Sequence, residues 1–293
     1  MLPPKLKRLL NTPVSYLRPL WDVIYFLMAR TATNHRFDLC FVITPGRSGS
    51  EYLSSLFLNE KHVVARHESR PQFTGAVYRL MELCGLEGTR RWRKRAKEAS
   101  ISKLMGAQTG ATTYLESSHR YLLGWSDVTL FDSPCSHVIV LERPARDTYN
   151  SALDLNWYHF SNPASTHWLP SKRFLAKQLG LNKWANHAYF ICAYLFWFYH
   201  KKREFLSSLS EGIQTISVDL KNLEDLSEVN RLRQWLGHEP LTSLPPTKRN
   251  TRDKLKNREL NRISLDDALD YIALNLPGHL IDSFQAFREE VAK

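Results

Sequence analysis

Cysteine is scarce in this chain of 293 residues, and its four cysteines lack the spacing of a metal site or a redox motif. There is no CxxC pair, and Cys40, Cys135 and Cys192 lie in or beside apolar runs, as structural thiols do. The tripeptide Gly-Lys-Ser/Thr is also absent, which argues against a magnesium-dependent nucleoside triphosphatase. The sequence therefore predicts reduced, structural cysteines and no required metal.

Long apolar runs are lacking too. The segment 19–29 (PLWDVIYFLMA) is short for a membrane span and contains Asp22, while the aromatic segment 184–206 is more typical of a buried helix. We expect a packed helix over 19–29, or at most a peripheral membrane contact through it, in a cytoplasmic protein.

Acidic residues are outnumbered, since 40 Lys and Arg stand against 29 Asp and Glu, for a net charge of +11. Such a surface attracts anionic ligands, nucleic acid or acidic lipid headgroups, and charge alone does not choose among them. The run 90–97 (RRWRKRAK) places six cations around Trp92. It is either a patch for nucleic acid or acidic glycan, or a solvated helix face.

Five segments have the composition of buried strands: 37–44, 62–67, 112–117, 136–143 and 214–220. Helical stretches separate them, which predicts an α/β fold with a central parallel sheet of about five strands between layers of helices, and helical extensions at both termini. We expect an N-terminal helical extension over 1–36 and a single domain over 37–293. Ligands of such folds bind at the carboxyl ends of the strands.

The first strand runs into the loop TPGRSGSEY (44–52), which has the composition of an anion-binding turn. Gly46 and Gly49 allow a tight turn, and the following backbone amides can point toward an anion. Arg47 adds a permanent positive charge. The candidate binding residues of this loop are Arg47, Ser48, Gly49, Ser50, Glu51 and Tyr52.

A second motif follows the fourth strand, in the segment VIVLERPARDTYNSAL (138–153). Arg143 ends the strand, Pro144 suits the first turn of a helix, and Ser151 comes eight residues after Arg143. An arginine at a strand end and a serine two turns into the next helix can approach one phosphate from two sides. A surface arginine and a merely structural serine remain the alternative.

Together and in this order, the two motifs resemble the sulfotransferases that use 3′-phosphoadenosine 5′-phosphosulfate (PAPS). The resemblance covers about residues 38–240 and implies a P-loop-type fold with PAPS as the donor. It implies that Arg47 and its loop bind the 5′-phosphosulfate and that Arg143 and Ser151 bind the 3′-phosphate. The basic residues Lys248 and Arg249, with Asn250, are similar in place and charge to the segment that closes over the nucleotide.

The same resemblance suggests the acceptor side of the site. Glu68 stands where carbohydrate and tyrosine sulfotransferases have a glutamate that looks like the general base, and the neighbouring His67 is a rival. His119, in YLESSHRYL (114–122), is a further catalytic candidate, and Glu116 and Ser118 beside it are weaker ones. One departure is Glu51, where the family usually has Thr or Ser, because a carboxylate there repels an anion.

The sequence thus predicts a sulfotransferase that moves a sulfuryl group from PAPS to a hydroxyl or amine. The basic surface suggests an acidic acceptor such as a glycan or glycolipid, and we expect no nucleic-acid partner. Two alternatives stay open: a P-loop phosphotransferase or other nucleotide-binding enzyme, and a non-catalytic basic module that binds nucleic acid or acidic glycan through 90–97 and 248–262.

Overall fold

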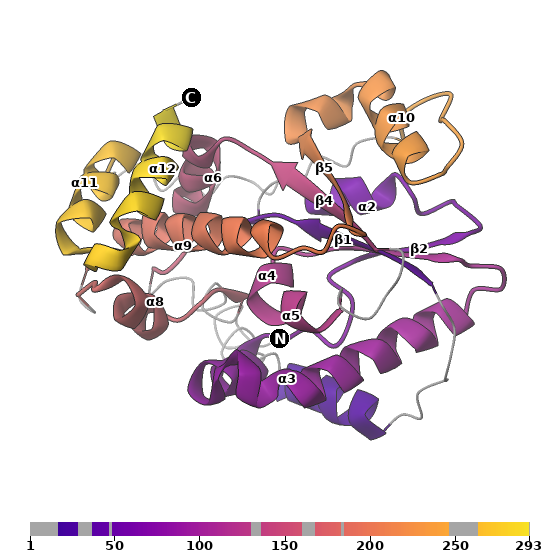
Figure 1. The fold of residues 1–293 in the computed structure, drawn as a ribbon, viewed down its shortest axis with the longest axis horizontal. Coiled ribbons are helices and arrows are strands. Elements are labelled where there is room, and N and C mark those ends of the chain that lie inside the picture. The colour runs from indigo at the N-terminus through magenta and orange to yellow at the C-terminus, as the bar shows by residue number, and fades with distance from the viewer. Residues whose placement is uncertain are drawn as a thin grey trace, which may run out of the picture.

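The fold is built on a five-stranded parallel sheet, seen nearly edge-on in Figure 1. The computed structural model describes residues 17–28, 37–46, 49–129, 136–159, 168–182, 185–245 and 263–292. The strands follow the order β2-β3-β1-β4-β5, and every neighbouring pair is parallel. Their bounds are β1 Asp38–Ile43, β2 Val63–His67, β3 Thr113–Ser117, β4 Ser136–Glu142 and β5 Gln214–Asp219. All five predicted strands and the α/β fold class are confirmed.

Strand β1 lies at the centre of the sheet, and its side chains alternate between two cores. Cys40 and Val42 belong to one buried cluster, whereas Phe41 and Ile43 belong to the other. The composition of 214–220 predicts a buried strand, but this is wrong for β5, an edge strand in which only Val218 is buried.

One face of the sheet is covered by the short helix α2 (Ser50–Ser55), the 3₁₀ helix η1 (Leu220–Glu224) and α10 (Leu226–Trp235). Leu53, Phe57 and Leu232 from this layer pack with Val42 and Ile139 of the sheet. This smaller core holds the helix that follows the predicted anion-binding loop against the strands.

The other face carries the larger layer of helices (Figure 1). Its central helix is α9 (His187–Ser207), which is buried along most of its length, as predicted for an internal helix. Other helices of the chain on this side are α3 (Gly75–Gly106), α4 (Tyr121–Gly124), α5 (Ser126–Thr129), α6 (Ala145–Asp154), α8 (Lys172–Leu179), α11 (Leu265–Asn275), η2 (Gly278–Leu280) and α12 (Ile281–Ala292). Helix α3 is kinked at Gly85, where φ is 75°.

Residues 17–28 form a helix that packs on the larger core through Val23 and Phe26. Trp21, Tyr25 and Met28 on the same helix are exposed. Within the ranges that the structure describes, no helix is both long and apolar enough to cross a membrane.

Candidate active site at the carboxyl edge of the sheet

The predicted site residues follow strand ends that are neighbours in the sheet. Glu68 follows β2, His119 lies just beyond β3, the predicted anion-binding loop follows β1, and Arg143 follows β4. Since these strands are parallel and adjacent in the order β2-β3-β1-β4, all four segments emerge at one edge. This edge is the candidate active site.

The loop after β1 is held from several directions. The hydroxyl of Tyr194 on α9 donates a hydrogen bond of 2.9 Å to the carbonyl of Pro45. Gly46 and Gly49 have φ of 89° and 74°, the left-handed region that favours glycine. A Cβ on Gly49 would lie 2.3 Å from Cδ1 of Leu220, so a side chain there would displace Leu220 and would also be strained by the positive φ.

The loop lies directly against His119. A Cβ added to Gly46 would lie 3.4 Å from Cβ of His119 and 3.4 Å from the ring of Trp157. The backbone of the loop at Gly46 therefore lies close to the segment after β3. Arg47 and Ser48, at the centre of the loop, lie outside the described residues, as do Lys248, Arg249 and Asn250.

Glu68 is bound on both carboxylate oxygens. Nδ1 of His119 lies 2.5 Å from Oε1, and a guanidinium nitrogen of Arg120 donates to Oε2 at 2.5 Å. Burial alone would raise the pKa of Glu68, but the charges of His119 and Arg120 and the hydrogen bond from His119 outweigh it and hold the pKa well below the ordinary value. Glu68 is thus a carboxylate fixed in its ionised form and a poor proton acceptor.

The backbone of Glu68 is unusual as well, because its φ of 51° lies in the left-handed region. Its amide donates to the carbonyl of Ser117 at 3.0 Å, and Gln72 donates to its carbonyl at 2.8 Å. A non-glycine residue in this conformation is strained, and such strain is kept where the surroundings fix it. The turn aims the Glu68 side chain toward the segment after β3.

His67, the predicted rival base, has a different setting. The Ser117 hydroxyl donates its one hydrogen to the carbonyl of Ser50 at 2.6 Å, so it accepts from Nδ1 of His67 at 3.1 Å. Nε2 of His67 lies 4.0 Å from Oε1 of Glu68. Burial lowers the pKa of His67, although Glu68 opposes that shift. The Ser117 hydroxyl thus links the end of β3 to the start of α2, and His67 at the end of β2 bonds to that hydroxyl.

A buried polar cluster around Glu116 holds the turn that follows β2. Glu116 is 1% exposed and forms an ion pair with the fully buried Lys97 of α3. Its carboxylate also accepts from the amide and hydroxyl of Ser69 and from the hydroxyl of Tyr114. The expectation that Glu116 faces an acceptor is therefore wrong, since its oxygens are used inside the core. The cluster anchors Ser69, the residue after Glu68.

Arg120 was not anticipated from the sequence. Its side chain is 3% exposed, and apart from the bond to Glu68 its Nε and other terminal nitrogen find no acceptor among the residues that the structure describes. Buried donors without acceptors are unfavourable unless a ligand or water takes them. The sequence signal was only the basic residue next to His119, which carries no pattern of its own.

Two of the six cations in the basic run 90–97 are buried and do not contribute to a surface patch. Arg93 is buried and bound to Asp127 through both terminal nitrogens at 2.6 Å, and Lys97 is the partner of Glu116. Four cations, at 90, 91, 94 and 95, are left toward solvent on α3. A nucleic-acid patch built on all six is therefore ruled out.

The nucleotide-side candidates lie across the same edge. Arg143 follows β4 directly, Ser151 lies on α6, and both side chains are half-buried. Glu51 is exposed in the first turn of α2, and Tyr52 packs on the smaller core. The described residues contain no cluster of three or more His, Cys, Asp or Glu side chains arranged for a metal.

No protein-family model matches the chain, and no curated protein matches it either. Three solved structures are similar to it. The sulfotransferase domain from the curacin biosynthetic pathway has 14% identity over 88% of this chain and 99% of its own, with a TM-score of 0.49. The sulfotransferase domain from the Synechococcus PCC 7002 olefin synthase is 13% identical, covers 91% of this chain and 98% of its own length, and has a TM-score of 0.48.

The third is a sulfotransferase from Alicyclobacillus acidocaldarius, with 14% identity over 89% of this chain and 97% of its own and a TM-score of 0.48. At such identities and with TM-scores below 0.5, these likenesses assign neither a family nor an activity to the chain. The residues of the site carry the functional argument.

Proposed function

We propose that this protein transfers a sulfuryl group from PAPS to a hydroxyl or amine acceptor. The observation that carries the proposal is the contact between the glycine loop after β1 and the His119–Glu68 pair, with Gly46 against His119. A loop suited to a phosphosulfate and a proton-accepting pair then meet at one point, as a transfer reaction requires.

In this proposal His119 is the general base. Nδ1 of His119 is bound to Glu68, which leaves Nε2 to take the proton of the acceptor. Glu68 orients the imidazole and stabilises its protonated form, because a carboxylate with a depressed pKa binds a cation well and a proton poorly. The sequence had favoured Glu68 itself as the base, and we now assign it to positioning.

The bond changes balance with these residues. The acceptor oxygen or nitrogen forms a bond to sulfur, the bond from sulfur to the 5′-phosphate oxygen breaks, and the acceptor proton passes to His119. Negative charge then develops on the leaving phosphate oxygen. Arg47 and the loop amides would neutralise it, and the Arg120 nitrogens that have no acceptor among the described residues suit the sulfuryl oxygens.

The nucleotide side rests on the sequence motif and on placement. Arg143 comes directly after β4 and Ser151 lies on α6, and β4 neighbours β1 on the side opposite to β3, the strand that His119 follows. They would bind the 3′-phosphate, and Lys248, Arg249 and Asn250 would close over the nucleotide. The positive φ of Gly46 and Gly49 allows the tight turn that a phosphate-binding loop needs.

Ligand binding separates this function from its alternatives. We expect adenosine 3′,5′-bisphosphate to raise the melting temperature of the protein, because binding to the native state stabilises it, and ATP to do so less. Stabilisation by ATP alone would favour a phosphotransferase, and stabilisation by a short oligonucleotide alone would favour a binding module. Transfer of labelled sulfuryl from PAPS to a panel of sugars, lipids, phenols and peptides then identifies the acceptor.

A further inference from the structure

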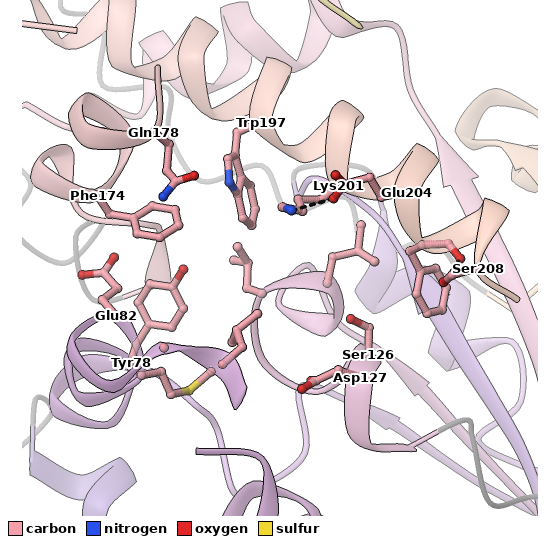
Figure 2. A pocket seen from close by; sticks show the side chains of 16 residues that line it. Tyr78, Glu82, Ser126, Asp127, Phe174, Gln178, Trp197, Lys201, Glu204 and Ser208 are labelled. Atoms are coloured by element: carbon pink, nitrogen blue, oxygen red, sulfur yellow. Dashed lines mark hydrogen bonds and ion pairs between the residues drawn. The ribbon is translucent and has the colours of Figure 1, made fainter. Parts of the chain in front are cut away.

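A pocket of about 470 Å³ lies among the helices that cover the larger core, between α3, α4–α5, α8 and α9. Figure 2 shows side chains from these elements meeting around it. The kink of α3 at Gly85 lies in its wall. Pockets of this volume are typical of small-molecule sites.

The wall of the pocket is mostly apolar and rich in aromatic rings. Phe174 and Trp197 lie edge to face, with ring centroids 5.9 Å apart. The apolar side chains of the wall are Tyr78, Met81, Leu86, Leu122, Leu123, Phe174, Trp197 and Phe205. A ligand here gains free energy by burying an apolar or aromatic body.

The charged groups of the wall already have partners. Glu82 accepts from Arg79 and from the amide of Ser171, each at 2.7 Å. Asp127 is bound to Arg93, and Lys201 is bound to Glu204 in the dashed pair of Figure 2. A charged ligand would have to compete with these pairs, so the pocket favours a neutral molecule.

One polar atom of the wall stands out. Trp197 is 6% exposed, and its indole Nε1 finds no acceptor within the described parts of the chain. Figure 2 shows this nitrogen on the side of the ring that faces Gln178 and Phe174, across from Tyr78. Indole nitrogens only donate, and buried donors are usually bonded. The pocket therefore offers a hydrogen bond to an oxygen acceptor.

We propose that this pocket binds a small, neutral, mainly apolar molecule whose carbonyl, ether or hydroxyl oxygen accepts a hydrogen bond from Nε1 of Trp197. The aromatic wall suits an aromatic or alicyclic body. None of the wall residues has a role in the proposed sulfuryl transfer, so the site stands independently of that function.

The test uses three probes with the same ring system: 2-acetylnaphthalene, naphthalene and 2-naphthoate. The first carries an acceptor oxygen but no hydroxyl or amine, so it binds without being a substrate for transfer. Protein labelled with 5-fluorotryptophan gives signals for its eight tryptophans, and the Trp197→Phe variant identifies the signal of Trp197. We expect 2-acetylnaphthalene to shift the Trp197 signal in a saturable manner and 2-naphthoate to leave it in place.

Affinities come from equilibrium dialysis. Trp197→Phe should weaken the binding of 2-acetylnaphthalene roughly 3- to 10-fold, as expected for one lost hydrogen bond. The affinity for naphthalene should change by less than about 2-fold. Equal weakening of both probes would overturn the role of the indole nitrogen.

A pocket-filling variant tests the site without removing the indole. Leu86 lines the pocket and is 44% exposed, so Leu86→Trp should be tolerated and should reduce probe binding at least about 10-fold by occupying the space. Leu83→Trp is the matched control, because Leu83 lies on the same helix, is 81% exposed and is not part of the wall. Unchanged binding in Leu86→Trp, or saturable binding of 2-naphthoate with equal affinity, would refute the proposal.

Discussion

Nδ1 of His119 lies 2.5 Å from Oε1 of Glu68, and the opposite oxygen of the same carboxylate is bound to Arg120. The carboxylate thus binds both an imidazole and a guanidinium, close to the glycine loop that follows β1. In the proposed function the two residues have different roles: Glu68 orients the imidazole, and His119 accepts the proton.

The first prediction concerns the base. His119→Asn should lower turnover roughly 100- to 10,000-fold, the usual loss for a positioned general base, while donor binding remains. Glu68→Gln should lower turnover less, because the imidazole remains but loses its orienting partner. Single-turnover transfer from labelled PAPS measures both.

His67→Asn serves as the control for this pair and should retain turnover within about tenfold, since Nδ1 of His67 bonds to Ser117 and its Nε2 lies 4.0 Å from Oε1 of Glu68. A near-parent rate in His119→Asn, together with a loss in Glu68→Gln, would return the role of base to Glu68.

A second prediction follows from the depressed pKa of Glu68. The folded pKa lies below the ordinary value of 4.5, so the carboxylate contributes stability above about that pH, and this contribution is lost as pH falls toward the folded pKa. At pH 7, Glu68→Gln should lower the free energy of unfolding by on the order of 3 kcal/mol, because the buried Arg120 loses its counter-charge.

Urea denaturation at several pH values measures this difference, which should shrink below about pH 4.5. Glu87→Gln is the control: Glu87 is exposed, with Arg90 4.0 Å away, and its substitution should leave the pH profile unchanged. A difference between parent and Glu68→Gln that stays constant down to pH 3 would contradict the ionised assignment.

The sequence predicts some features of the fold and the site but not others. The strands were predictable because apolar, β-branched runs alternate with helical segments, and parallel strands bring their carboxyl ends to one edge. The sequence Ser-x-x-Asp at 264–267 is likewise typical of a helix start, and in the structure the Ser264 side chain accepts a hydrogen bond from the amide of Asp267 at the start of α11.

The contact between Glu68 and His119 was not predictable, because it depends on the register between β2 and β3. His67 pairs with Ser117, which places the residues after the two strands side by side. The roles of Arg93 and Lys97 were hidden for another reason. Their spacing places both on one face of α3, but only the packed structure shows that this face is buried.

A third prediction tests the buried ion pair under the site. Lys97→Met leaves the Glu116 carboxylate without its counter-charge in the core and should cost about 3–5 kcal/mol of stability. The double variant Lys97→Met with Glu116→Gln should recover part of that loss, because no unpaired charge remains. Lys94→Met is the control, since Lys94 is partly exposed and lies 3.8 Å from Glu98, and it should change stability by less than about 1 kcal/mol. A double variant that is less stable than Lys97→Met would contradict this account.

The last prediction concerns the nucleotide side, where a single phosphate distinguishes two ligands. If Arg143 and Ser151 bind the 3′-phosphate, Arg143→Ala should weaken the binding of adenosine 3′,5′-bisphosphate by about 2 kcal/mol, the range of a charge-assisted hydrogen bond. Ser151→Ala should weaken the same binding by about 1 kcal/mol. Adenosine 5′-monophosphate lacks the 3′-phosphate, so its affinity should not change in either variant. Arg146→Ala is the matched control, because Arg146 lies three residues after Arg143, in the first turn of α6, but is bound to Asp266 on the surface. Isothermal titration gives each affinity, and equal weakening of both nucleotides by Arg143→Ala would mean that Arg143 acts on the fold or on general charge, and not on the 3′-phosphate.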